Sequence, residues 1–185
     1  NFFPFLFFSL FFSPLNIFSL SFFFFQTHTA KRKCSIQDCL KSFAGDEILS
    51  GDDAYYCSKC KKHRKSTKNM SIQRWPPVLC LHIKRFHGGK KLSTKVNFPM
   101  TGLDLREINS VISETSDTQL PDPIYHLMGV SNHMGGLHSG HYTADCKSPV
   151  SGDWFNYDDS RVSQSSESKL SKASAYILFY AREDV

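Results

Sequence analysis

The chain has 185 residues and a formal net charge of +5 at pH 7, and this length suits one ordinary domain. Much of the basic charge comes from two short runs, residues 31–33 and 60–68. So local an excess of charge argues against a dedicated nucleic-acid-binding protein, and we expect no nucleic-acid partner.

Residues 1–30 differ in composition from the rest of the chain. They contain no Lys, Arg, Asp or Glu and hold most of the 17 phenylalanines. The segment is long enough to cross a bilayer, but it contains Pro4 and Pro14, and no basic region precedes it as in a secretory signal. We interpret it as an artefact of the gene model, with a membrane anchor or a core element as the alternatives. We therefore expect it to lie outside the fold, and we expect a membrane partner only if residues 1–25 are a genuine anchor.

A short amphipathic helix is predicted from Ser35 onward. Ile36, Leu40 and Phe43 recur at the spacing of one helix face. Ser35 is of a type that commonly begins a helix, and Gly45 lies where the pattern ends.

Strand patterns dominate the chain after this helix. Tyr55 and Tyr56 precede a CxxC pair, which is expected at the tip of a β-ribbon. Residues 86–99 predict a hairpin with a glycine-containing turn, and the polar residues 101–123 predict an exposed connection. The other predicted strands cover residues 68–76, 77–86, 124–133, 141–148, 153–159 and 175–183. The body is therefore expected to be a mainly antiparallel sheet with few helices.

The six cysteines are expected to be free thiols rather than disulfides. Cys80 and Cys146 fall within strand patterns, and a CxxC pair in a reducing cytosol indicates metal or redox chemistry. Cys57 and Cys60 therefore predict half of a metal site, and a redox pair is the alternative.

A second hairpin is predicted to place His141 beside an acid. Residues 148–152 are turn formers between two strand patterns, so antiparallel pairing about Val150 brings His141 opposite Asp158 or Asp159. The register is uncertain by one residue, which leaves both acids open. Such a pair is the arrangement of a catalytic base and its orienting acid, and a structural ion pair is the alternative.

No cysteine is identified from the pattern as the nucleophile that this base would activate. Cys146 and His141 are separated by an odd number of residues along one strand, so their side chains point to opposite faces. Cys80 lies in an apolar run, where desolvation makes a thiol inert. Cys34 and Cys39 lie beside or on the predicted helix with no histidine nearby.

Several motifs together resemble the C-terminal portion of the ubiquitin-specific protease family of cysteine deubiquitinases. They are YYCSKCKKHRKSTKNMSIQRWPPVLCLHIKRF, VNFP, GGLHSGHYTADCKSPVSGDWFNYDDSRV and AYILFYARE, which follow one another between residues 34 and 183. The resemblance implies an α+β papain-like cysteine protease fold. Residues 31–185 would be its C-terminal part, an incomplete and mainly antiparallel β palm and fingers half with few helices.

By the same resemblance, His141 would be the general base, and Asp158, the first acid of YDD, would orient it. Cys57 and Cys60 would supply one half of a structural zinc site in the fingers, which requires four ligands. The family's nucleophilic cysteine lies in a box resembling GLxNLGNTC, which this sequence does not contain. The chain alone is therefore predicted to be inactive.

The resemblance implies a ubiquitin C-terminal hydrolase, which removes ubiquitin from protein conjugates by thiol-dependent isopeptide hydrolysis. Its partners would be ubiquitin and ubiquitinated proteins, and its location the cytoplasm or the nucleus. One alternative is a catalytically inactive module that binds ubiquitin. Another is a metalloenzyme with a ligand set drawn from His126, His133, His138, His141 and Asp158.

Overall fold

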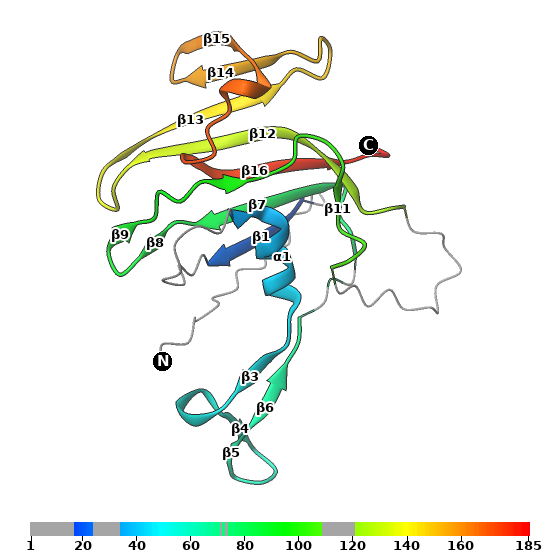
Figure 1. The fold of residues 1–185 in the computed structure, drawn as a ribbon, viewed down its shortest axis with the longest axis vertical. Coiled ribbons are helices and arrows are strands. Elements are labelled where there is room, and N and C mark those ends of the chain that lie inside the picture. The colour runs from blue at the N-terminus through cyan, green and yellow to red at the C-terminus, as the bar shows by residue number, and fades with distance from the viewer. Residues whose placement is uncertain (1–16, 24–33, 71, 73, 109–120) are drawn as a thin grey trace.

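A mainly antiparallel sheet with one helix beside it forms the centre of the molecule, and a narrow ribbon projects away from it (Figure 1). The computed structural model describes residues 17–23, 34–70, 72, 74–108 and 121–185. The sheet has the strand order β1-β7-β16-β12-β13-β14-β15, with β11 paired to β12. Its strands are β1 (Ile17–Phe23), β7 (Val78–Lys84), β11 (Leu103–Asp104), β12 (Ile124–Gly135), β13 (Gly140–Lys147), β14 (Trp154–Asp158), β15 (Arg161–Ser165) and β16 (Ala175–Arg182).

Helix α1 (Ile36–Ala44) begins and ends where the sequence predicts. The Ser35 hydroxyl accepts a hydrogen bond from the Asp38 backbone N–H, and the Asp38 carboxylate accepts one from the Ser35 N–H, both at 3.2 Å. This capping box satisfies N–H groups that the first helical turn leaves without partners. The predicted apolar face is buried, with Ile36 1%, Leu40 0% and Phe43 5% exposed.

The hydrophobic core joins this helix face to alternate residues of the central strands. Leu79 and Leu81 of β7 pair with Tyr180 and Leu178 of β16, and each of the four side chains is fully buried. Because side chains alternate along a strand, these residues share one face of the sheet. Burying each leucine stabilises the fold by about 1.5–3 kcal/mol, so the core determines how β7, β16 and their neighbours align.

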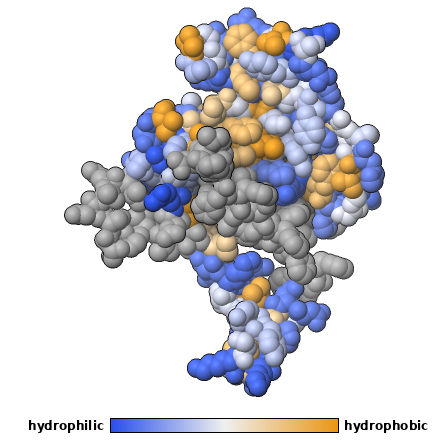
Figure 2. Space-filling view, turned by 180° about the vertical axis from the view of Figure 1, so that it is seen from behind, coloured by the Kyte–Doolittle hydropathy of each residue, from blue (hydrophilic) through white to orange (hydrophobic). Residues whose placement is uncertain are grey.

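The projecting ribbon contains the predicted CxxC hairpin. Its strands are β3 (Glu47–Leu49), β4 (Tyr55–Cys57), β5 (Lys62–Arg64) and β6 (Ser66–Lys68), in which β3 pairs with β6 and β4 with β5. A 3-10 helix, Gly51–Asp53, lies between β3 and β4. Seen from behind, the end of the ribbon is largely hydrophilic, whereas hydrophobic surface gathers over the sheet (Figure 2). The ribbon therefore depends on backbone pairing more than on core burial.

The remaining elements are short. Strand β8 (Phe86–His87) pairs with β9 (Lys90–Lys91) in the predicted hairpin, where Gly88 and Gly89 both have positive φ. Strand β2 (Cys34–Ser35) pairs with β10 (Val96–Asn97) in parallel, and a second 3-10 helix covers Glu167–Lys169. No helix among the described residues is long and apolar enough to cross a membrane.

Two predicted segments are corrected by the structure. Of the described residues between 68 and 76, only Lys68 lies in a strand, and Ile72 and Trp75 are buried in the core at 5% exposure without strand pairing. The connection predicted to be exposed contains Leu103 and Leu105, both 0% exposed, because β11 pairs with β12 and its neighbours pack inward. Burial here follows a tertiary contact that the polar composition of the segment concealed. Residues 109–120 of that connection lie outside the described residues.

Several strands lie outside the predicted set, and β15 and β1 are the longest of them. Strand β15 pairs with β14 although its pattern, RVSQS, is polar and mostly exposed. Strand β1 pairs with β7 in parallel and falls within the segment expected to lie outside the fold. The domain boundary near residue 30 stays a prediction, because residues 24–33 lie outside the described residues.

Candidate active site

The site lies where two hairpins share strand β13. The β12–β13 ladder ends with Met134 opposite His141 and Gly135 opposite Gly140. A short loop follows, in which the Gly136 N–H donates to the Ser139 carbonyl at 2.8 Å. His141 therefore sits on a rigid strand directly beside a tight turn.

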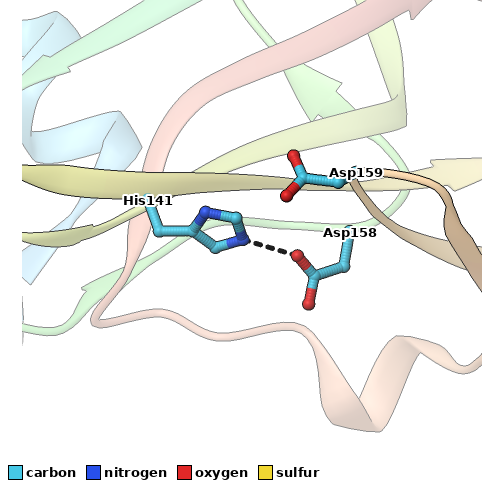
Figure 3. Close-up of side chains that lie close together, drawn as sticks. All are labelled: His141, Asp158 and Asp159. Carbon is cyan, nitrogen blue, oxygen red and sulfur yellow. Dashed lines mark hydrogen bonds and ion pairs between the residues drawn. The ribbon is translucent and has the colours of Figure 1, made fainter.

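His141 and Asp158 meet across the sheet (Figure 3). The His141 Nε2 atom and an Asp158 carboxylate oxygen are 2.5 Å apart, and both side chains are about half exposed. Ala144 pairs with Tyr157, a register that by extension brings Asp158 level with Thr143, two residues from His141 along β13. Asp158 is therefore the diagonal neighbour on the same face, within reach of a side chain. The predicted proximity is confirmed, and the acid that bonds to His141 is Asp158.

Asp159 lies close to His141 but belongs to a turn rather than to a strand. It adopts φ 50° in the two-residue connection between β14 and β15, where Asp158 pairs with Arg161. Aspartate tolerates this left-handed conformation better than most residues. The ligand atoms of His141, Asp158 and Asp159 lie within 4.8 Å of one another, so two negative charges surround the imidazole.

This arrangement favours the imidazolium form of His141. The hydrogen bond with Asp158 raises the pKa of His141 above its ordinary value against the opposing effect of desolvation, and the charges of Asp158 and Asp159 add to the increase. Nδ1 of His141 has no hydrogen-bond partner among the described residues. The imidazole ring is thus held through Nε2, and Nδ1 is available to another group.

A buried polar network supports the same face of the sheet. Asp145, 6% exposed, accepts hydrogen bonds from the Asn132 side-chain amide at 2.7 Å and from the Asn156 amide at 3.0 Å. Ser174 donates to the Asn132 side-chain oxygen at 3.1 Å. The network joins β12, β13 and β14 next to the strand ends that carry His141 and Asp158. Sequence reasoning missed it, because polar residues in a strand pattern give no sign that they face one another.

No cysteine accompanies the pair. All six cysteines lie among the described residues, and none joins the cluster of His141, Asp158 and Asp159. A side chain on Gly129 would lie 3.6 Å from the Cys146 sulfur, which places Cys146 in packing contact with β12. Burial and the nearby Asp145 raise the pKa of the Cys146 thiol, so it matches the predicted packing role.

The structure does not gather the ligands of the alternative metalloenzyme. His133 is buried at 4% exposure and pairs with Tyr142, so it faces the side of the sheet opposite His141. His126 lies 3.9 Å from Glu183 at the far end of β12. In the part of the chain that the structure describes, the only group of three or more potential metal ligands is His141 with the two aspartates.

Comparison with known proteins decides the family. Residues 22–180 match the family model described as ubiquitin carboxyl-terminal hydrolase. The chain belongs to this family, the ubiquitin-specific proteases.

The curated relatives of this ubiquitin carboxyl-terminal hydrolase family member are longer than the chain. Ubiquitin carboxyl-terminal hydrolase 2 of Gallus gallus is 43% identical over 150 residues, which cover 79% of this chain and 40% of that protein. Ubiquitin carboxyl-terminal hydrolase 15 of Homo sapiens is 40% identical over 153 residues, which cover 80% of this chain and 15% of that protein. The chain thus spans less than half the length of the relatives it matches.

Solved structures show the same fold. A SAGA Ubp8/Sgf11/Sus1/Sgf73 DUB module bound to ubiquitin aldehyde contains a chain that superposes with a TM-score of 0.67 at 34% identity, over 87% of this chain and 35% of that one. A yeast SAGA DUB module with an Sgf73 variant gives a TM-score of 0.68 at 33% identity, over 87% of this chain and 34% of that one. The mainly antiparallel sheet with one helix is therefore part of the fold of these family members.

In this family member, the CxxC pair lies on the projecting ribbon, far along the chain from His141. The Cys60 N–H donates to the Cys57 sulfur at 3.5 Å, and Lys61 has φ 52° as the chain turns back into β5. Hydrogen bonds from Cys60 and from the Lys59 backbone lower the pKa of the Cys57 thiol. Thiolate is the form that binds metal, and a lowered pKa favours that form of Cys57.

The other described pair of sulfurs is of a different kind. Cys34 and Cys39 approach to 4.0 Å at the start of helix α1. Burial raises the pKa of both thiols, which opposes metal binding. They do not complete the Cys57 and Cys60 pair.

Proposed function

We propose that this chain is the β-rich C-terminal part of a papain-like deubiquitinase domain, comprising the palm and fingers over residues 31–185. The full-length protein then hydrolyses isopeptide bonds at the C-terminus of ubiquitin. Membership of the ubiquitin carboxyl-terminal hydrolase family supports the reaction, and the His141–Asp158 pair supports the assignment of the acid-base residues. Ubiquitin and ubiquitinated proteins are its partners, in the cytoplasm or the nucleus.

One observation carries the mechanism: Nε2 of His141 is bonded to Asp158, and Nδ1 has no hydrogen-bond partner in the part of the chain that the structure describes. Nδ1 is then the atom that takes the proton from a cysteine thiol, which another part of the full-length protein supplies. Asp158 fixes the tautomer in which Nδ1 accepts, and it stabilises the imidazolium that forms.

The reaction proceeds in two halves. The thiolate attacks the carbonyl carbon of the isopeptide bond, and the C–N bond breaks as Nδ1 of His141 returns the proton to the leaving lysine amine. Water then attacks the thioester, His141 accepts a proton from it, and that proton returns to the departing sulfur. No cysteine of this chain lies beside His141, so the chain by itself does not cleave.

The catalytic assignment is tested by His141→Ala in the full-length protein. Cleavage of a ubiquitin-linked fluorescent reporter should fall by at least about a thousand-fold, since a triad member is removed. His126→Ala is the matched control, because His126 lies on β12 away from Asp158. Unchanged turnover with His141→Ala would refute the role. A wild-type protein that binds ubiquitin without cutting the reporter would instead favour an inactive binding module.

Cys57 and Cys60 form one half of a structural zinc site in this proposal. Zinc would tie the ribbon to a second pair of ligands and order its tip. The lowered pKa of the Cys57 thiol supports the assignment. In the full-length protein, metal analysis should find stoichiometric zinc that is lost with Cys57→Ser and kept with His141→Ala. The opposite pattern would move the metal to the histidine site.

A further inference from the structure

His133 occupies an unusual position beside the catalytic hairpin. Its side chain is buried at 4% exposure among aromatic rings. The ring centroid lies 4.6 Å from that of Tyr142 and 5.5 Å from those of Phe86 and Tyr176. Tyr142 directly follows His141 in the chain, so the His133 ring supports one neighbour of the proposed base.

The same ring also contacts the other neighbour of His141. A Cβ atom built on Gly140 would lie 2.2 Å from Nε2 of His133, far closer than atoms can approach, and 2.7 Å from the Met134 carbonyl oxygen. The space above residue 140 is thus filled by the His133 ring. The His133 ring thus lies against the backbone of Gly140 and the side chain of Tyr142, the two residues that flank His141.

The backbone of His133 is itself firmly held. Its N–H donates to the Ser174 carbonyl at 2.9 Å, and its carbonyl accepts from the Lys91 ammonium at 2.6 Å. The segment around Ser174 is fastened in turn by Arg85, a buried residue that donates to the Lys172 carbonyl at 3.0 Å and to the Ala175 carbonyl at 2.7 Å. Because the backbone of His133 is held in place, its ring can fix the position of the residues that it contacts as well as fill space.

Packing alone does not account for a histidine here. Its Nδ1 atom is buried without a hydrogen-bond partner among the described residues, and an unpaired buried nitrogen destabilises a fold relative to a hydrocarbon ring. Burial and the nearby Lys91 lower the pKa of His133, which favours the neutral form of its ring. The imidazole lies so close to residue 140 that a Cβ atom there would clash with it, and a six-membered ring is larger than an imidazole. A small, flat, uncharged ring meets these constraints.

We propose that His133 is a positioning residue for the deubiquitinase reaction: its ring, wedged against Gly140 and Tyr142, holds the backbone of His141 where Nε2 meets Asp158. The inference rests on the proposed function for its effect on catalysis. The packing of His133 against Gly140 and Tyr142 and the His141–Asp158 bond are both properties of this chain alone, and their coupling can be measured without turnover.

The test follows the His141–Asp158 bond directly by NMR titration of the imidazole signals in the 185-residue chain. Asp158→Asn sets the reference, since losing the carboxylate lowers the pKa of His141. His133→Ala should shift the pKa of His141 in the same direction, and His133→Phe should do so as well because its larger ring displaces Gly140. His126→Ala, on the same strand, should leave it unchanged. A His133→Ala chain that unfolds at lower temperature yet keeps the wild-type pKa of His141 would overturn the proposal.

Kinetics of the full-length protein give the second readout. His133→Ala should lower kcat by about 10- to 100-fold with little change in KM, as expected when a catalytic group is misplaced. If activity falls only in proportion to the amount of folded protein, so that kcat per folded molecule is unchanged, His133 is not a positioning residue.

If His133→Ala does not fold, Tyr142→Leu serves instead, because that side chain is 55% exposed and tolerates change. It should shift the pKa of His141 downward by a smaller amount, and no shift would count against the proposal. Failure of the proposed function is distinguishable: full-length His141→Ala would then keep its turnover, whatever the titrations show.

Discussion

Two regions of the molecule bring a pair of reactive side chains together, and they do so in different ways. One is the end of the sheet that carries His141 and Asp158, and the other is the tip of the ribbon that carries Cys57 and Cys60. His141 and Asp158 are 17 residues apart and meet through the β13–β14 ladder and the buried amides behind it. Cys57 and Cys60 are three residues apart and meet through one turn on an exposed ribbon. The catalytic pair is therefore coupled to the stability of the sheet, whereas the thiol pair depends on local backbone geometry.

The largest effect is expected when core packing is removed from the sheet, because the catalytic pair depends on the stability of the sheet and the thiol pair does not. Leu178→Ala deletes a fully buried side chain on β16, between β7 and β12, and should lower the free energy of unfolding by about 2–5 kcal/mol. Urea unfolding followed by tryptophan fluorescence measures the change. Val150→Ala, at a side chain that is 96% exposed, should change it by less than about 0.5 kcal/mol. Comparable losses in the two variants would mean that the core does not extend to β16.

The buried network should give the next largest effect. Asp145→Ala leaves the amides of Asn132 and Asn156 without their shared acceptor, and this should lower the free energy of unfolding by about 1–3 kcal/mol. The exposed Asp153, in the turn of the same hairpin, offers the control Asp153→Ala. The NMR signals of His141 should also change with Asp145→Ala alone. If neither stability nor those signals respond, the network does not support the site.

Changing pH should affect the sheet end through the charge on His141. Asp158 raises the folded-state pKa of His141, so the pair's stabilisation is complete below the unfolded pKa of about 6.5 and is lost as pH rises through the folded value. Asp158→Asn should remove this contribution, which urea unfolding at several pH values would show. Because both side chains are half exposed, the change should be smaller than that of Asp145→Ala. A pH dependence that survives Asp158→Asn would have to come from other groups.

The smallest effect on the sheet is expected from the thiol turn. Cys57→Ser removes one sulfur from an exposed ribbon. In the 185-residue chain it should change the free energy of unfolding, measured by urea unfolding, by less than about 0.5 kcal/mol. The same variant should remove any zinc retained by the full-length protein. A large loss of sheet stability would show that the ribbon and the sheet fold as one cooperative unit, contrary to the comparison.

Sequence reasoning succeeded where a structural signal extends over a few residues. Ser35 and Asp38 form the capping box that begins α1, and Gly88 and Gly89 turn the β8–β9 hairpin with positive φ. The four predicted strands around the site appear as β12, β13, β14 and β16. It failed at residues 101–108, because a polar neighbourhood concealed the buried Leu103 and Leu105, and it omitted β15, which has no apolar alternation.

The sequence by itself determined the local elements and a short choice of partners for His141, because helix caps, turns and alternation are encoded by neighbouring residues. Only the tertiary structure decided that Asp158 lies diagonally across from His141, that Asp145 joins Asn132 and Asn156, and that the ring of His133 lies on Gly140. These contacts depend on the register between strands and on which face is buried. Both are determined by packing across the whole sheet, which no short stretch of residues specifies.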